Sequence, residues 1–176
     1  MRRPVHILLP VHNRCEITRA CVAQLSAQTY DPIDLVVIDD GSTDATTKML
    51  AQNAPTATVL DGDGNLWWAG CLQRGLEHLA TSGAQAEDVV VFLNDDTMFD
   101  PYFIENGVKA IENSPDLMLL AQAYSLQTGR FIEVGARVDW SKLSFDSVTS
   151  IDQANCLSTR GLFMRFGNAV AVRITQ

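Results

Sequence analysis

Several features that mark common classes of protein are missing from this sequence. Its 4 cysteines show no C-x-x-C spacing and no pairing with histidine, which argues against a zinc site. No apolar run is long enough to cross a membrane, and the first apolar stretch is soon interrupted by proline and histidine, unlike that of a signal peptide. We therefore expect a reduced protein of the cytoplasm, at most peripheral to the inner face of the membrane, with no membrane span.

Positive charge is also scarce. The chain has 13 Lys and Arg against 21 Asp and Glu, a formal net charge of −8 and a pI of about 4.7. A nucleic-acid partner would need a basic face, so none is expected. A nucleotide ligand stays compatible, because a bound metal ion can carry the positive charge. The 176 residues, 47% of them hydrophobic, are enough for one globular domain.

The most informative stretch is an apolar run, Val89–Leu93, that leads directly into Asn94, Asp95 and Asp96. A short apolar run predicts a strand buried on both faces, and the carboxyl ends of such strands are where ligands bind in open α/β sheets. Two adjacent carboxylates repel each other, which favours a divalent metal ion as compensation. An ordinary solvated acidic loop is the alternative at this point.

A second apolar run, starting at Asp34, ends in the same way at Asp39 and Asp40, with Gly41 at the turn. Any of residues 42–44 could cap the following helix, so a simple capped turn is the alternative here. That alternative does not explain two acids directly at the strand end.

The hydrophobic pattern predicts alternating strands and helices. Strands are expected at 5–11, 34–38, 57–60, 89–93 and 117–123, and helices at 16–28, 42–53, 66–81 and 101–113, with Asp100 as the N-cap of the last one. Short alternating stretches such as 131–134 indicate antiparallel strands afterwards. The fold class is therefore α/β: a single domain with a mostly parallel central sheet flanked by helices, followed by a smaller antiparallel segment.

The segment after the third strand carries two further signals. Residues 61–65 resemble the start of a calcium-binding loop, but Leu66 and Leu72 occupy positions that need Gly and Glu, so a glycine-rich turn is the better interpretation. Trp67 and Trp68 are adjacent and cannot both point inward from a helix. One of them is expected to line a ligand cleft or, alternatively, the rim of the core.

Four motifs now occur in a specific order. They are Leu9–Arg14, Asp39–Asp44, Gly64–Gly70 and Asn94–Asp96. Together they resemble the family 2 glycosyltransferases, which have the GT-A fold, and are most similar to the rhamnosyltransferase-like branch. The resemblance covers about residues 5–166.

The resemblance implies a role for individual residues. Asp40 would contact the nucleotide base, and Pro10, Val11 and His12 would contribute to the nucleoside pocket. Asp95 would lie near ribose or phosphate, and Asp96 would bind Mg²⁺ or Mn²⁺. Residues 1–115 would form the nucleotide-sugar-binding half and residues 116–176 a partial acceptor-side half, including an acceptor-side segment at 159–163.

The implied reaction is metal-dependent transfer of a sugar, with inversion, from a UDP- or dTDP-sugar to a glycan or lipid-linked acceptor in the synthesis of cell-surface polysaccharide or glycan. Relatives carry the general base on a later acidic helix, whereas residues 167–176 contain no carboxylate. We therefore expect a C-terminally truncated chain without its general base, and a homodimer that covers the exposed apolar surface. The alternative is a non-catalytic module that binds nucleotide sugar or a partner. A nucleotidyltransferase is less consistent, because its glycine-rich basic signature is absent.

Overall fold

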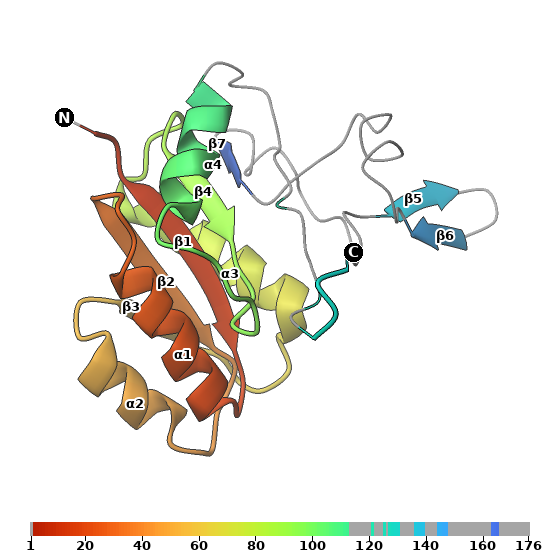
Figure 1. Ribbon diagram of the computed structural model, residues 1–176. Helices are drawn as coiled ribbons and strands as arrows, with labels where there is room; N and C mark the ends of the chain where they lie inside the picture. Colours follow the sequence, from red (N-terminus) through yellow and green to blue (C-terminus); the bar gives the residue numbers. More distant parts are fainter. Residues whose placement is uncertain are drawn as a thin grey trace.

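The computed structural model describes residues 2–112, 121, 125, 127–130, 136–139, 144–147 and 163–165, the last three ranges as backbone strands only. Helices and strands alternate along the first 112 residues (Figure 1). These elements are β1 (Val5–Val11), α1 (Cys15–Ser26), β2 (Ile33–Asp39), α2 (Thr46–Asn53), β3 (Thr58–Asp61), α3 (Trp67–Ser82), β4 (Val89–Phe92) and α4 (Phe103–Glu112). Three short strands follow: β5 (Ala136–Asp139), β6 (Ser144–Ser147) and β7 (Phe163–Arg165).

The main sheet has the strand order β3-β2-β1-β4-β7. Strands β1 to β4 are parallel, and β7 pairs antiparallel with β4. The predicted parallel α/β sheet flanked by helices is thus confirmed. The antiparallel segment stays a prediction: β5 and β6 pair with each other, but the strands expected at 117–123 and 131–134 lie almost entirely outside the described residues.

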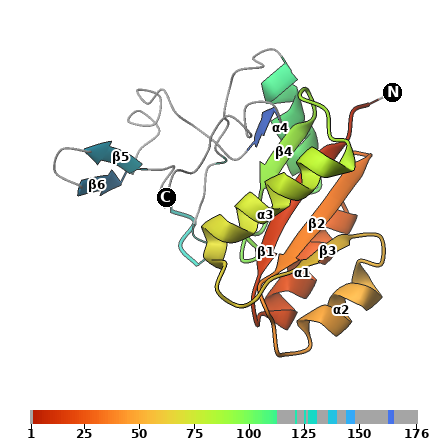
Figure 2. The ribbon, with the colours of Figure 1, turned by 180° about the vertical axis from the view of Figure 1, so that it is seen from behind.

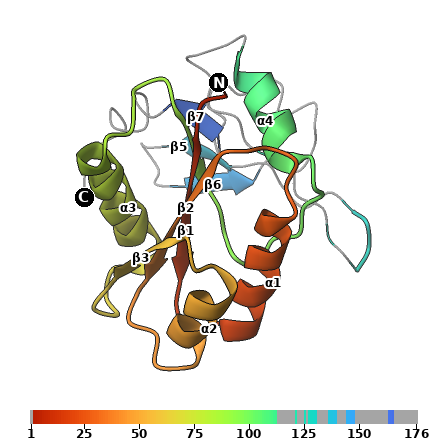
Figure 3. The same cartoon turned by 90° about the vertical axis from the view of Figure 1, so that its left-hand side faces the viewer.

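Each face of the sheet has its own hydrophobic core, because side chains alternate along a strand. Odd-numbered residues of β1, such as Ile7 and Leu9, pack with α1, α2 and α4, while Leu8 packs with α3 on the other face. Viewed along the sheet, α3 lies on one side and the other three helices lie on the other (Figures 2 and 3). Strands covered on both faces explain why β1, β2 and β4 appear as continuous apolar runs.

All four helix starts differ from the sequence prediction, those of α2 and α4 by two residues or more. Helix α4 begins at Phe103, not at Pro101, because Asp100 forms a turn first: its carboxylate accepts the N–H of Tyr102 (2.7 Å) and its carbonyl that of Phe103 (3.2 Å). Helix α2 begins at Thr46 with Ala45 as its N-cap, so none of residues 42–44 is the cap; Asp44 instead accepts the N–H of Thr46 at 2.9 Å from the preceding turn. Within the described ranges no helix is both long and apolar enough to cross a membrane.

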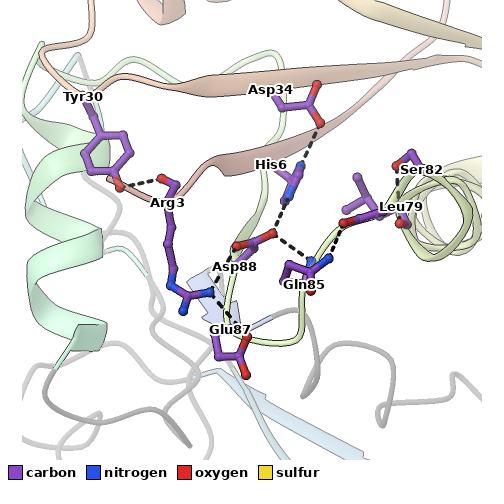
Figure 4. A network of polar contacts seen from close by, with 10 residues as sticks. Arg3, His6, Tyr30, Asp34, Leu79, Ser82, Gln85, Glu87 and Asp88 are labelled. Atoms are coloured by element: carbon purple, nitrogen blue, oxygen red, sulfur yellow. Dashed lines mark hydrogen bonds and ion pairs between the residues drawn. The ribbon is translucent and has the colours of Figure 1, made fainter. Parts of the chain in front are cut away.

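A polar network lies at the amino-terminal end of the strands. The imidazole of His6 lies between the carboxylates of Asp34 and Asp88, at 2.7 Å from Nδ1 and 3.4 Å from Nε2 (Figure 4). Burial lowers the pKa of His6, but the hydrogen bonds and charges of the two carboxylates outweigh it, so the pKa is raised overall. The network joins β1, β2 and the turn before β4, and sequence patterns gave no sign of it.

Candidate nucleotide-binding site

The predicted site residues gather at the carboxyl end of the parallel strands. Strands β2 and β3 follow on one side of β1 and β4 lies on its other side, so the strand order reverses between β1 and β4, which is where open α/β sheets form a ligand crevice. A cavity of about 300 Å³ lies there. Its lining consists of Pro10, Val11, His12, Arg14, Asp40, Gly64, Trp67, Trp68, Cys71 and Asp95.

All five residues predicted to contact the nucleotide line this cavity, whereas Asp96 lies beside it through its contact with Arg14. Another cavity, of about 620 Å³, lies at the opposite end of the strands next to Arg3 and Tyr30. None of the four motifs contributes to that larger cavity, so its chemistry is unrelated to the motif residues.

The loops after β1 and β2 are held together by Asn13. Its side-chain oxygen accepts the N–H groups of Thr43 (2.7 Å) and Asp44 (3.2 Å), and its own N–H donates to the hydroxyl of Ser42 (2.9 Å). Asn13 adopts a φ of 52°, a left-handed conformation that Asn tolerates better than most residues. Hydrogen bonds through Asn13 therefore join the first two motifs, which both contribute residues to the cavity lining.

The neighbouring acids Asp39 and Asp40 have different roles. Asp39 accepts the N–H of Ser42 (3.0 Å) and the hydroxyl of Thr47 (3.0 Å), so its carboxylate stabilises the start of α2. Its side chain thus serves the capped turn that was the alternative interpretation of this motif.

Asp40 faces the cavity and orders the loop before α3. Its Oδ1 accepts the N–H groups of Gly64 (2.9 Å) and Leu66 (3.3 Å), and its Oδ2 accepts the N–H of Trp67 (3.0 Å). The approach is so close that a Cβ on Gly62 would lie 2.5 Å from Oδ1. A carboxylate has about four acceptor positions, so roughly one stays available for a ligand.

His12 forms part of the cavity wall with a defined tautomer. Its Nδ1 donates to the carbonyl of Asp40, and its Nε2 accepts from the side-chain amide of Asn13 at 2.9 Å. This pattern corresponds to a neutral imidazole with its proton on Nδ1. Both ring nitrogens already have hydrogen-bond partners, so the ring forms part of the cavity wall and does not offer a free base.

The acidic pair after β4 contacts a single guanidinium. Arg14 Nη1 lies 3.1 Å from Asp95 Oδ1, and Arg14 Nη2 lies 3.0 Å from Asp96 Oδ2. Asp95 is buried and also accepts the hydroxyl of Thr18 at 2.9 Å. Burial raises the pKa of Asp95, an effect that the Thr18 hydrogen bond and the Arg14 charge oppose and the Asp96 charge reinforces.

Arg14, the cation beside this acidic pair, was not among the residues predicted from the sequence. Repulsion between the two carboxylates correctly predicted a nearby cation, but the predicted cation was a metal ion and not an arginine. Arg14 belongs to the first motif, and the loops after adjacent parallel strands meet at one edge of the sheet. That β1 and β4 are neighbours is known only from the folded sheet, so the sequence offered no direct signal for this contact.

The donor set is compatible with a divalent ion. Among the described residues no group of three His, Cys, Asp or Glu side chains is arranged to hold a metal. Mg²⁺, however, needs only one or two carboxylates together with substrate phosphates. Asp95 and Asp96 already face one common cation, so the pair fits an ion that a diphosphate would complete.

Two tryptophans border the cavity and remain largely exposed, Trp67 at 80% and Trp68 at 52%. The indole N–H of Trp68 donates to the side chain of Asn94 at 2.8 Å, which links α3 to the loop after β4. Neither indole points into the core, in line with the expectation that one would line a cleft. Next to them, burial raises the pKa of the Cys71 thiol to about 11, so this cysteine stays protonated.

These features define an open α/β-sheet protein with its ligand cavity at the switch point of the sheet. The sequence profile of the family "Glycosyl transferase family 2" matches residues 6–165. The chain therefore belongs to glycosyltransferase family 2.

Individual relatives support the same assignment. The chain is 30% identical over 105 residues to a glucosyl-dolichyl phosphate glucuronosyltransferase of Haloferax volcanii, covering 58% of this chain and 32% of that protein. It is 24% identical over 132 residues to the putative glycosyltransferase EpsH of Bacillus subtilis, covering 73% and 37%. The chain thus spans about a third of the length of these relatives.

A solved structure is similar in fold. The mannosyltransferase PcManGT of Pyrobaculum calidifontis, in complex with GDP-Man and Mn²⁺, matches with a TM-score of 0.59 at 23% identity. The match covers 70% of this chain and 36% of that protein.

Proposed function

We propose that this chain binds a nucleotide-diphosphate sugar, and that the protein transfers its glycosyl group with inversion to an acceptor hydroxyl. The observation that carries the proposal is the convergence of Pro10, Val11, His12, Asp40 and Asp95 on one cavity at the carboxyl edge of the sheet. Family membership and the donor complex of the Pyrobaculum relative support the same chemistry.

In this proposal the donor nucleoside lies over the loops after β1 and β2. The remaining acceptor position on Asp40 receives the ring N–H of a uracil or thymine base, which favours UDP- or dTDP-sugars. Pro10, Val11 and His12 form the wall next to the base. The Gly64–Gly70 motif is similar to that of the rhamnosyltransferase-like branch, and this similarity supports a proposed role in the synthesis of cell-surface polysaccharide or glycan.

The diphosphate extends toward the acidic pair. Asp96 is the proposed ligand of a Mg²⁺ or Mn²⁺ ion, and Asp95 lies near the ribose or phosphate. When bound, such an ion supplies Lewis-acid stabilisation of the charge on the leaving diphosphate. The protein's own contribution is to hold Asp95 rigidly through Thr18, so that the pair keeps its orientation.

The group that removes the acceptor proton is not assigned. Within residues 2–112, the acids and the imidazole that line the cavity all have partners: Asp40 holds backbone N–H groups, Asp95 contacts Arg14, and His12 uses both ring nitrogens. We therefore propose that the acceptor-side half begins after residue 115 and that the base comes from a segment after about residue 166.

Calorimetric titration with UDP, dTDP and ADP, with and without Mn²⁺, tests the donor site. We expect uridine or thymidine diphosphate to bind in preference to ADP, and more tightly with metal. Release of nucleoside diphosphate from UDP- or dTDP-sugars then tests turnover. Equal affinity for ADP would contradict the proposed base contact, and binding without turnover would favour a non-catalytic nucleotide-sugar-binding module.

A further inference from the structure

Arg14 occupies the position between Asp95 and Asp96 that a divalent ion would need. One guanidinium nitrogen contacts each carboxylate, at 3.1 and 3.0 Å. An ion bound to Asp96 would replace the contact that this carboxylate makes with Arg14 Nη2. The two cations therefore compete for one acidic pair.

The backbone of Arg14 is held in place, whereas its side chain is partly exposed. Its neighbour Asn13 is held by three hydrogen bonds to the loop after β2, which anchors the backbone at this point. The Arg14 side chain itself is 40% exposed, and among the described residues its contacts are the two carboxylates. A long side chain anchored only at one end can exchange partners without moving the fold.

The displaced guanidinium has a second partner available. Arg14 lines the same cavity as His12 and Asp40, so a diphosphate bound there would lie within the reach of its side chain. Guanidinium groups bind phosphate oxygens in a bidentate manner, as they bind carboxylates. Breaking the contacts of Arg14 with the two carboxylates would then cost little free energy, because a bound diphosphate offers equivalent contacts.

From this geometry we infer that Arg14 couples metal binding to nucleotide binding: it occupies the acidic pair when the site is empty and transfers to the diphosphate when donor and metal enter together. This inference rests on the proposed function of the site. It gives Arg14 a positioning role, in which metal binds weakly to the free protein and tightly to the nucleotide complex. Coupling of this kind is reciprocal, so metal strengthens nucleotide binding by the same factor.

The test is a titration with Mn²⁺ alone, followed by electron paramagnetic resonance of the free ion, on the parent chain and on Arg14→Gln. The variant should bind Mn²⁺ about tenfold more tightly, since losing a competing charge-assisted hydrogen bond is worth about that factor. Repeating the titration with saturating UDP should strengthen Mn²⁺ binding in both proteins, because the diphosphate also binds the ion, but by a larger factor in the parent than in the variant. The tighter Mn²⁺ binding of Arg14→Gln should be lost in the double variant Arg14→Gln, Asp96→Asn.

Arg19→Gln is the matched control, because it also removes one positive charge, from helix α1 just after Arg14, but Arg19 pairs with Glu16 rather than with the acidic pair. It should behave like the parent. If Arg14→Gln does not fold without metal, Arg14→Lys replaces it: one ammonium cannot hold both carboxylates as a guanidinium fork does, so tighter Mn²⁺ binding than in the parent is still expected.

Unchanged or weaker Mn²⁺ affinity in the Arg14 variants would overturn the inference, as would the absence of Mn²⁺ binding in every variant. The proposed function fails separately, if no pyrimidine nucleotide binds while the variants still gain Mn²⁺ affinity. If the nucleotide still binds but the Arg14 variants leave Mn²⁺ affinity unchanged, the inference fails while the proposed function stands.

Discussion

Replacing His6 by leucine should destabilise the fold and change how its stability depends on pH. The imidazole is 8% exposed and contacts Asp34, which is partly exposed, and Asp88, which is 5% exposed. Leucine fills most of the space but donates no hydrogen bond. Asp88 would keep only the N–H of Gln85 at 2.8 Å and a long contact with Arg3 at 3.8 Å.

The size of the effect follows from these contacts. Losing a hydrogen bond to a charged group and leaving a buried carboxylate without its main cation should together cost about 2–4 kcal/mol in the free energy of unfolding. The lower end applies if Arg3 moves toward Asp88 in the variant. Urea denaturation at pH 6 followed by circular dichroism measures the difference directly.

The pH dependence has a definite sign. The folded-state pKa of His6 is raised, so its contribution to stability is complete below the unfolded value of about 6.5 and is lost as pH rises through the folded value. Within that window the parent should lose stability with a slope of at most about 1.4 kcal/mol per pH unit, and the leucine variant should not. The pKa of Asp34 is lowered by its hydrogen bond with His6, so its contribution is lost only as pH falls below about 3.8.

The controls use the other titratable groups nearby. Arg3 contacts Asp88 and Glu87, and the charge of His78 acts on Asp34, so His78→Gln tests whether a different histidine causes the slope. That variant should keep the parent's slope above pH 6.5. A leucine variant with the same pH profile as the parent, or a parent whose stability rises between pH 6.5 and 8, would refute the reasoning.

Three further predictions concern the candidate site. Asp40→Asn should weaken UDP and dTDP by about 1–3 kcal/mol more than ADP in calorimetry, because it replaces a charged acceptor; an equal loss for ADP would limit Asp40 to ordering the loop. Asp96→Ala should reduce the gain in UDP affinity on adding Mn²⁺ by at least about tenfold, since even outer partners of a metal typically carry that much affinity; a variant as tight as the parent with metal present would make the assignment wrong. Gly62→Ala should cost about 1–3 kcal/mol in thermal unfolding and also weaken UDP, because its Cβ would meet Asp40 at 2.5–2.8 Å. Gly83→Ala is its control: at a φ of +95° with open space around it, the change should affect stability but not UDP binding.

Much of the fold could be predicted from local patterns. Strand β1 was predicted with its observed limits, and the other three parallel strands within one residue at each end, because short apolar runs next to acids and glycines are local signals. The helix ends were less accurate: α1 stops at Ser26 and α4 starts at Phe103, since hydrogen bonds in the adjoining turns decide these limits. The motif residues were likewise identified, because each motif lies at or after the carboxyl end of a predicted strand.

The sequence could not show that neighbouring residues have separate roles. Asp39 and Asp40 are the same residue type, and the alternation of a strand says only that they face opposite sides. The structure decides that Asp39 meets Ser42 and Thr47 while Asp40 meets the backbone before α3. In the same way, the need for a cation beside Asp95 and Asp96 was clear, but its identity was not.

The sequence by itself determined the alternation of strands and helices, the two hydrophobic faces and the family of the chain. The tertiary structure alone decided that Arg14 contacts Asp96, 82 residues away, and that His6 lies between Asp34 and Asp88. The physical reason is that these contacts depend on which strands are neighbours. Hydrophobic periodicity predicts that a strand is buried, but the order β3-β2-β1-β4 arises only when the whole sheet packs, and that order places the loops after β1 and β4 side by side.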